Sequence, residues 1–223
     1  MKRMIKAAEE RGYDFSDLSD TAKWHALEQQ DIIEYIDYLS GLEEQEGFDS
    51  LKYALDSVEC RLTRNSFSYG INRSDYDIEL TPRGEDIFSV AGLDGSYQVE
   101  LPTAEGDGLY VGEAFVDAFI DSVKAVKKEV DKINADILEY LNSSEDAEDN
   151  LSWDDDDVPE IYAFNERLYD IGKDYVRAVK VAADAAVSNW SQGVNSYLDM
   201  DIEDARYILD DSAFVFDIDG NVI

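Results

Sequence analysis

The sequence predicts an α+β protein in which helices dominate. Apolar residues recur every three or four positions before residue 63 and again after residue 113, as on one face of a helix. Between residues 66 and 112, short β-branched and aromatic runs alternate with turn signals, as in strands. Helices and strands are thus segregated along the chain, which is typical of α+β domains.

Residues 1–63 are predicted to be helical, with two amphipathic helices. In the first, apolar residues follow helical spacing from Leu27 to Leu39, after Ser and Asp residues suited to capping. Gly41 is its predicted end. The second helix lies in residues 48–65, where apolar residues again fall on one face.

Residues 66–112 are predicted to form a small antiparallel β-meander of three to five strands. The candidate strands are "SFSYGI", "YDIELT", "DIFSV", "YQVELP" and "GLYVG". Asp94-Gly95 lies between two of these runs and is a good hairpin signal.

The rest of the chain is predicted to contain two long amphipathic helices, at residues 113–142 and 160–199. An acidic linker separates them at residues 143–158, and a short helix follows at about 201–211. Residues 212–223 alternate as in a strand, which could return to pair with the meander.

These segments define an N-terminal helical part (1–63), a small sheet (64–112) and a long-helix part with a short C-terminal strand (113–223). We expect one compact unit or two small domains. The chain has one Cys, no run of about 18 apolar residues and no signal-peptide pattern, so we expect a cytoplasmic protein without a membrane span.

The C-terminal motif "VFDIDGNV" resembles the nucleophile strand of haloacid-dehalogenase-type phosphatases. The resemblance would make Asp217 the nucleophile and Asp219 the acid/base. However, no alternating βαβ pattern precedes the motif, Asn221 replaces the usual Thr, and the later motifs do not follow. We therefore interpret it as a strand with a tight turn at Asp219-Gly220 or Gly220-Asn221. It also resembles the start of a calcium loop, but lacks the Glu expected at loop position 12.

Other catalytic signals are weak. His25 is the sole histidine and cannot form a two-His metal site, and Cys60 is expected to be a small core residue. The sequence has no phosphate loop or nucleophile elbow. We therefore predict no enzyme activity, no catalytic residues, no cofactor and no metal site.

Charge is the unusual feature. The 223 residues carry 52 Asp and Glu against 19 Lys and Arg, a formal net charge of −33. Self-repulsion of this size opposes folding, yet the chain is 44% hydrophobic and has enough apolar material for a core. The acids form long blocks without bases, such as residues 24–51 and 133–166, so we expect single-sign surfaces and not salt-bridged helix faces.

Carboxylates every three residues on a helix would stand about 4.5 Å apart along the axis. B-DNA carries one phosphate per roughly 3.4 Å of each strand. The acidic helices can therefore present a pattern close to a phosphate backbone. The candidate contacts are Glu28, Asp31, Glu34, Asp37, Glu139, Glu145, Asp146, Glu148, Asp149, Asp154, Asp155, Asp156, Asp157, Asp199, Asp201, Glu203 and Asp204.

In charge, size and aromatic content the chain resembles the DNA-mimic inhibitors that phages and mobile elements use against restriction and other defences. The resemblance implies a partner with a basic nucleic-acid-binding surface, such as a nuclease, methyltransferase, helicase or repressor, and no direct binding of nucleic acid. The long helices could also form a homodimer. The alternatives are an acidic structural, assembly or chaperone-like protein that binds a basic partner, and a housekeeping domain adapted to high salt.

Overall fold

The computed structural model describes residues 12–63, 76–93, 97–143, 158–195 and 200–223. It confirms the α+β class: the described residues are mostly helical and form seven α-helices and one two-stranded antiparallel sheet. The chain divides into two compact units. We call Met1–Gln45 with Gln192–Ile223 the terminal unit, and Glu46–Ser191 the central unit.

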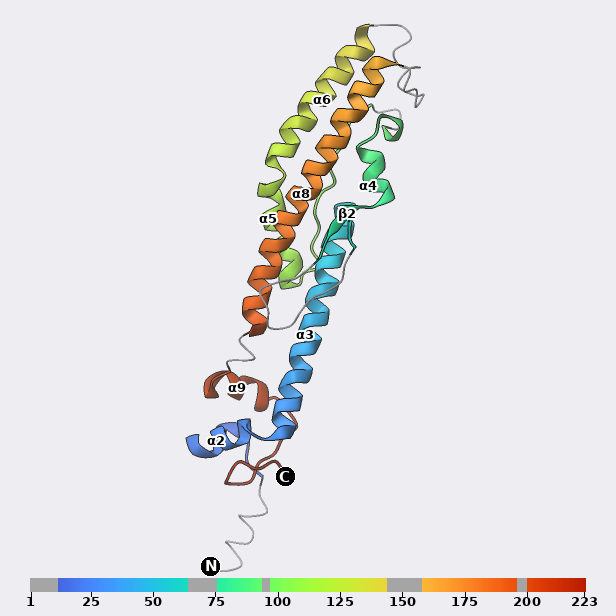
Figure 1. The fold of residues 1–223 in the computed structure, drawn as a ribbon. Coiled ribbons are helices and arrows are strands. Elements are labelled where there is room, and N and C mark those ends of the chain that lie inside the picture. Colours follow the sequence, from blue (N-terminus) through green and yellow to red (C-terminus); the bar gives the residue numbers. More distant parts are fainter. Residues whose placement is uncertain (1–11, 64–75, 94–96, 144–157, 196–199) are drawn as a thin grey trace, which may run out of the picture. The chain divides into compact units, whose positions relative to one another are not determined.

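The terminal unit is built from short helices around a small core. Its elements are the 3-10 helix η1 (Phe15–Asp17), α2 (Asp20–Leu27), the first half of α3 (Gln30–Ser57) and α9 (Ile202–Leu209). Helix α2 packs against α9, although more than 170 residues separate them in the sequence (Figure 1). The buried core contains Phe15, Leu18, Ala22, Ala26, Ile32, Ala205, Leu209 and Phe216.

The first predicted helix is in fact two helices, and its predicted end is wrong. Ser19 caps α2 by accepting a hydrogen bond from the Ala22 N–H, and the helix ends at Leu27. Helix α3 then begins at Gln30 and continues through Gly41 to Ser57. A glycine costs only about 1 kcal/mol in a helix interior, which the flanking turns can offset, so Gly41 does not stop this helix.

The C-terminal segment adds backbone pairing to the terminal unit. Phe216 exchanges two hydrogen bonds with Tyr13, of 2.8 and 3.0 Å, and forms a second antiparallel bridge with Val222. The expected tight turn is present, with Gly220 at φ +89°. The expected pairing with the meander is wrong, because Phe216 pairs with the N-terminal segment and its ring lies in the terminal core.

The central unit contains the small sheet and the longest helices. Strand β1 (Cys60–Leu62) pairs antiparallel with β2 (Ile78–Leu80), with Arg61 opposite Glu79. They are followed by α4 (Pro82–Ile87), the 3-10 helix η2 (Val90–Gly92), α5 (Tyr110–Ser122), α6 (Lys124–Ser143) and α8 (Pro159–Asn195). Figure 1 shows α8 running alongside α5 and α6, which follow one another end to end. The buried residues Leu51, Phe115, Ile133 and Leu168 join them to the second half of α3.

The meander is smaller than the sequence predicts. The run "DIFSV" is not a strand, because Thr81 caps a helix that starts at Pro82, a residue well suited to the first helical turn. The run "YQVELP" has no partner strand: the Asn134 side chain instead bonds both the N–H and the carbonyl of Val99, at 2.8 and 3.1 Å. In the run "GLYVG", helix α5 already begins at Tyr110. "SFSYGI" and Asp94-Gly95 lie outside the described residues.

The long helices follow the prediction with one correction. Residues 113–142 form two helices, α5 and α6, because the helix is interrupted at Val123, where the N–H bonds the carbonyls of Asp121 and Phe119. The prediction for 160–199 is confirmed as far as Asn195, and the short helix near 201–211 is confirmed as α9. The acidic linker at 143–158 lies almost wholly outside the described residues. Among the helices described, none is long and apolar enough to cross a membrane.

Candidate partner-binding surface

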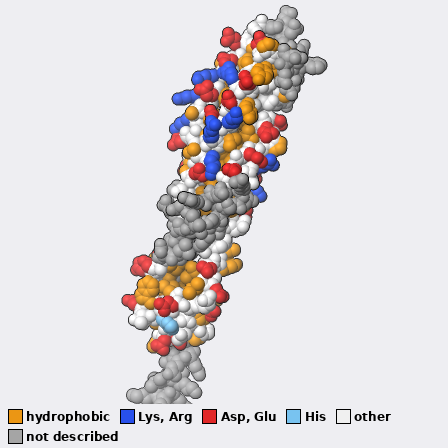
Figure 2. Space-filling model, viewed as in Figure 1, with side chains coloured by type: hydrophobic (Ala, Val, Ile, Leu, Met, Phe, Trp, Pro, Cys, Tyr) orange, Lys and Arg blue, Asp and Glu red, His pale blue; other side chains and the backbone are white. Residues whose placement is uncertain are grey.

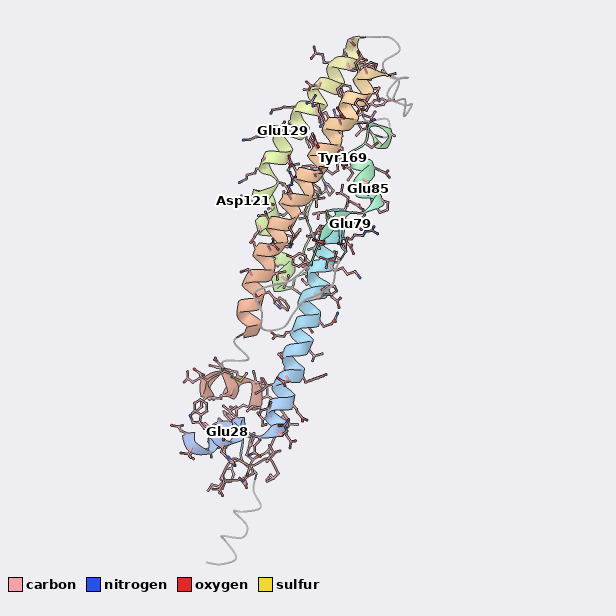
Figure 3. The ribbon with its side chains drawn as sticks, in the orientation of Figure 1. Glu28, Glu79, Glu85, Asp121, Glu129 and Tyr169 are labelled. Atoms are coloured by element: carbon pink, nitrogen blue, oxygen red, sulfur yellow. The ribbon has the colours of Figure 1, made fainter. Side chains whose placement is uncertain are left out.

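The acidic residues at the start of α3 form an exposed row. Asp31, Glu34 and Asp37 are all exposed, and none forms an ion pair within the described part of the chain. Glu34 accepts a hydrogen bond of 3.0 Å from the Gln30 side chain. Glu28 belongs instead to the end of α2, so the expected single row of four carboxylates is interrupted between Glu28 and Asp31 (Figure 3).

A second group of carboxylates lies at the start of α9. Asp201 caps the helix, because its side chain accepts hydrogen bonds from the N–H groups of Glu203 and Asp204, at 2.8 and 2.9 Å. Asp201 therefore has a structural role that the sequence reasoning did not assign to it. Glu203 and Asp204 are exposed in the first helical turn. Since α9 packs on α2, the terminal unit carries both acidic groups.

Three aromatic rings of the terminal unit are also exposed to solvent. Trp24 on α2, Tyr38 on α3 and Tyr207 on α9 are 54%, 62% and 78% exposed. The sequence reasoning placed aromatic residues in the core and missed these three. Helical periodicity could have indicated that two of them are exposed. Trp24 and Tyr207 fall on the polar sides of helices whose buried positions are occupied by alanine and leucine.

The described part of the terminal unit has few basic residues, and the other four bases of the unit, Lys2, Arg3, Lys6 and Arg11, lie outside that part. Residues 12–45 and 200–223 contain 16 Asp and Glu but only two basic residues, Lys23 and Arg206. Arg206 pairs with Asp210 at 3.4 Å. In the view of Figure 2, acidic side chains of this unit border hydrophobic ones, whereas Lys and Arg gather over α6 and α8 of the central unit.

The central unit balances much of its charge internally. On α6 and α8, basic residues pair with acids one helical turn away, as in Lys132–Glu129 at 2.6 Å and Lys180–Asp184 at 2.8 Å. Arg167 on α8 also pairs with Asp136 on α6. The expectation of single-sign helix faces is therefore wrong for α6 and α8, because their bases fall three or four residues from an acid.

Two aromatic rings of the central unit are covered by its own lysines. Lys173 Nζ lies 3.8 Å from the ring centroid of Tyr169, which projects from α8 (Figure 3). Lys180 Nζ lies 3.4 Å from that of Tyr76, whose hydroxyl donates a 2.7 Å hydrogen bond to Asp184. Burial raises the pKa of Tyr76 well above its ordinary value, so this hydroxyl remains a donor.

The other predicted contacts are separate from this surface. Glu139 is exposed on α6 and belongs to the central unit. The predicted homodimer through residues 113–142 and 160–199 stays a prediction. The remaining predicted contacts lie outside the described residues: Glu145, Asp146, Glu148, Asp149, Asp154, Asp155, Asp156, Asp157 and Asp199.

The phosphatase-like aspartate stabilises its own turn. Asp217 accepts hydrogen bonds from the N–H groups of Asp219 and Asn221, both at 2.9 Å, and from the Asn221 side chain at 2.8 Å. These bonds, led by that of the Asn221 side chain, lower the pKa of Asp217. The carboxylate is thus a turn acceptor, as the strand-and-turn interpretation expects.

The remaining reactive side chains have structural partners. The His25 Nε2 lies 3.1 Å from the Asn221 side-chain oxygen, so the histidine joins α2 to the C-terminal turn. Cys60 is fully buried, and burial, with a smaller contribution from the Glu59 charge, raises the pKa of its thiol to about 12. In the part of the chain that is described, no group of three or more His, Cys, Asp or Glu is placed to hold a metal ion.

No protein-family model matches this chain, and neither a curated protein nor a solved structure shows significant similarity to it. The exposed acidic residues of the terminal unit are therefore the feature from which a function can be inferred.

Proposed function

We propose that the protein is a non-enzymatic DNA mimic that inhibits a nucleic-acid-binding protein by occupying its basic surface. The proposed partner is a nuclease, methyltransferase, helicase or repressor, as in the anti-restriction and anti-defence inhibitors of phages and mobile elements. The observation that carries the proposal is the charge of the described part of the terminal unit, where residues 12–45 and 200–223 hold 16 acids against two bases.

The geometry of α3 supports this proposal. Asp31, Glu34 and Asp37 are exposed on one helix, with an axial rise of about 4.5 Å between successive residues. This spacing is of the same order as the roughly 3.4 Å between phosphates of one DNA strand. The side chains form no ion pairs within the described residues that a partner would have to break.

The buried core of the terminal unit also supports the proposal of DNA mimicry. Ile32 and Ala26 are fully buried on either side of the α2–α3 junction, and Ala205 and Leu209 anchor α9 to the same cluster. The helices that carry the carboxylates are therefore held in place before binding. A preorganised surface loses less conformational entropy when it binds than a flexible acidic tail would.

The proposal is tested by capture and competition. The full chain is immobilised and used to recover partners from cell lysates, and duplex DNA is then added to the captured complex. We expect the partner to be a DNA-binding protein, released by duplex in a saturable manner, with an affinity that falls steeply as salt rises.

Either of two other results would contradict DNA mimicry and favour an alternative function. A basic partner that duplex DNA does not displace would indicate an assembly or chaperone-like protein. Failure to capture a basic partner, together with a melting temperature that rises strongly from low to multimolar KCl, would indicate adaptation to high salt.

A further inference from the structure

One exposed face of α5 and α6 combines large apolar and charged side chains. Ile120 near the end of α5 and Leu138 near the end of α6 are 57% and 54% exposed, and Lys127 and Asp131 between them are exposed as well. Positions 127, 131 and 138 have the spacing at which side chains share one face of a helix. Ile120 belongs to the same face, because it lines one groove together with Lys127 and Asp131. We call these four residues the α6 stripe.

The groove lies at the Ile120 end of the stripe and has a volume of about 690 Å³. Its apolar lining comes from Val116, Ile120 and Val123 on one side, and from Leu101 and Pro102 in the segment before α5 on the other. Leu138 lies roughly 27 Å farther along the helices, at a rise of about 1.5 Å per residue. The stripe therefore has an apolar hollow at one end and an exposed leucine at the other.

The stripe is complementary to itself when two copies are antiparallel. Ile120 and Leu138 are equally far in sequence from position 129, and so are Lys127 and Asp131. A two-fold axis at that level would place Ile120 against the second copy's Leu138, and Lys127 against the second copy's Asp131. A parallel pair in register would instead bring each charge against its own kind, which is unfavourable.

The charge of α6 suits self-association in a strongly acidic chain. The helix carries four Lys and four Asp or Glu, so it is electrically neutral, whereas the whole chain has a net charge of −33. A second copy can therefore approach this helix without strong local repulsion. At physiological salt, repulsion between more distant exposed charges is screened over about 8 Å.

We propose that the α6 stripe is the interface of an antiparallel homodimer. Leu138 of each copy enters the groove of the other beside Ile120, which removes both exposed apolar side chains from water. Lys127 of each copy pairs with Asp131 of the other, and the two ion pairs fix orientation and register. This surface narrows the predicted homodimer from the long helices in general to one face of α5 and α6, and it does not depend on DNA mimicry.

The test measures self-association of the full chain by sedimentation equilibrium, at physiological salt and across the micromolar range. The charge variants are Lys127→Glu, Asp131→Lys and the two combined. Their control, Lys128→Glu, makes the same change in net charge as Lys127→Glu at an exposed position of α6 outside the stripe. Leu138→Gln tests the apolar contact, and Val181→Gln, at an exposed position of α8, is its control.

We expect the wild-type chain to form a dimer in this range. Either single charge reversal should weaken dimerisation about tenfold or more, because the two-fold axis makes each substitution replace two ion pairs by two like-charge contacts. The combined variant should recover to within a few-fold of wild type, since opposite charges face each other again. Leu138→Gln should also weaken the dimer about tenfold, since two apolar contacts are lost. Both controls should dimerise as the wild type does.

Orientation is tested separately by disulfide cross-linking. An oxidised mixture of Ile120→Cys and Leu138→Cys chains should form linked dimers, because these positions face each other in the antiparallel pair. Neither chain alone should form them, because a disulfide requires Cα atoms within about 7 Å. The native Cys60 is buried and does not compete.

Three results would overturn this inference. One is a wild-type chain that stays monomeric throughout the micromolar range. Another is a dimer that the single charge reversals and Leu138→Gln leave unchanged, since it would form through a different surface. The third is a combined charge variant that does not recover, or efficient cross-linking of either cysteine variant alone, since both contradict antiparallel pairing.

Discussion

The two units are both acidic but use their charges differently. The terminal unit holds 19 acids and six bases and the central unit 33 and 13, so the units differ in how their charges are paired and not in their balance of acids and bases. In the central unit, pairs such as Lys132–Glu129 and Arg167–Asp136 neutralise charge on the helix surface. In the terminal unit, Asp31, Glu34 and Asp37 have no such partners among the described residues.

This difference in ion pairing distinguishes two explanations for an acidic surface: ordinary solvation and the binding of a basic partner. Exposed ion pairs contribute only about 0–1 kcal/mol each, so the pairs of the central unit are consistent with an ordinary solvated surface. Unpaired carboxylates close together repel one another and weaken the fold. The exposed row of Asp31, Glu34 and Asp37 is readily explained if a basic partner compensates for that repulsion when it binds.

The substitutions with the largest expected effect test whether the two units have separate hydrophobic cores. Phe216 is fully buried in the terminal core, so Phe216→Ala should lower the free energy of unfolding of that unit by about 3–5 kcal/mol. Hydrogen exchange followed by mass spectrometry should show faster exchange in α2 and α9, with α6 and the adjoining part of α8 unchanged. The matched variant, Leu168→Ala, should cost about 2–5 kcal/mol and affect the central unit.

Uniform loss of protection across both units in either variant would contradict separate cores. The terminal and central units would then unfold together as one cooperative structure.

A second test makes the same substitution on both sides of the unit boundary. Gly47→Ala, in the central unit, would place a Cβ 2.5 Å from Cε2 of Trp190, and this crowding should cost about 1–3 kcal/mol. Gly41→Ala, in the terminal unit, meets nothing within 4 Å and should stabilise α3 by up to about 1 kcal/mol. Urea unfolding measures both, and opposite signs are expected. A stable Gly47→Ala protein would show that the Trp190 ring moves aside without cost.

The substitution with the smallest expected effect on stability, Asp217→Asn, lies in the C-terminal turn. The hydrogen bonds from Asn221 and Asp219 hold the pKa of Asp217 below its ordinary value of 3.8. The ionised form therefore stabilises the fold above about pH 4, and this contribution is lost as pH falls through the lowered pKa. Asp217→Asn should have a lower melting temperature than wild type at neutral pH. The gap should narrow in acid, and a gap that is constant with pH would contradict this account.

The sequence predicted the class and most helices, but not where helices break or strands pair. Helical periodicity identified α3 and α8 because their buried faces are long and regular. The prediction that the helix ends at Gly41 was wrong because a single glycine is tolerated inside a packed helix. The segment around Val99 has strand composition, but its partner is the Asn134 side chain, which no local pattern reveals.

The candidate surface was predicted in part. Asp31, Glu34 and Asp37 were correctly placed on an exposed helix, because charge and periodicity suffice for that. The exposure of Trp24 and Tyr207 was missed, although both residues fall on the polar sides of their helices. The difference in ion pairing between the units could not be predicted, because it required the boundary within α3 and α8.

The central claim is that the carboxylates of the terminal unit, and not net charge, bind the partner. It is tested most directly by binding kinetics, against the captured partner, of two variants that lose four charges each. One carries Glu28→Gln, Asp31→Asn, Glu34→Gln and Asp37→Asn. The other carries Glu85→Gln, Asp86→Asn, Glu113→Gln and Asp117→Asn, at exposed central-unit positions without ion pairs among the described residues.

We predict that the terminal-unit variant dissociates faster, because each lost charge-assisted contact contributes about 1.5–3 kcal/mol if shielded and about 0–1 if exposed. The central-unit variant should keep the wild-type dissociation rate and lose only some long-range steering of association. Equal effects of the two variants on dissociation would contradict the claim, because binding would then follow charge count and not the terminal surface.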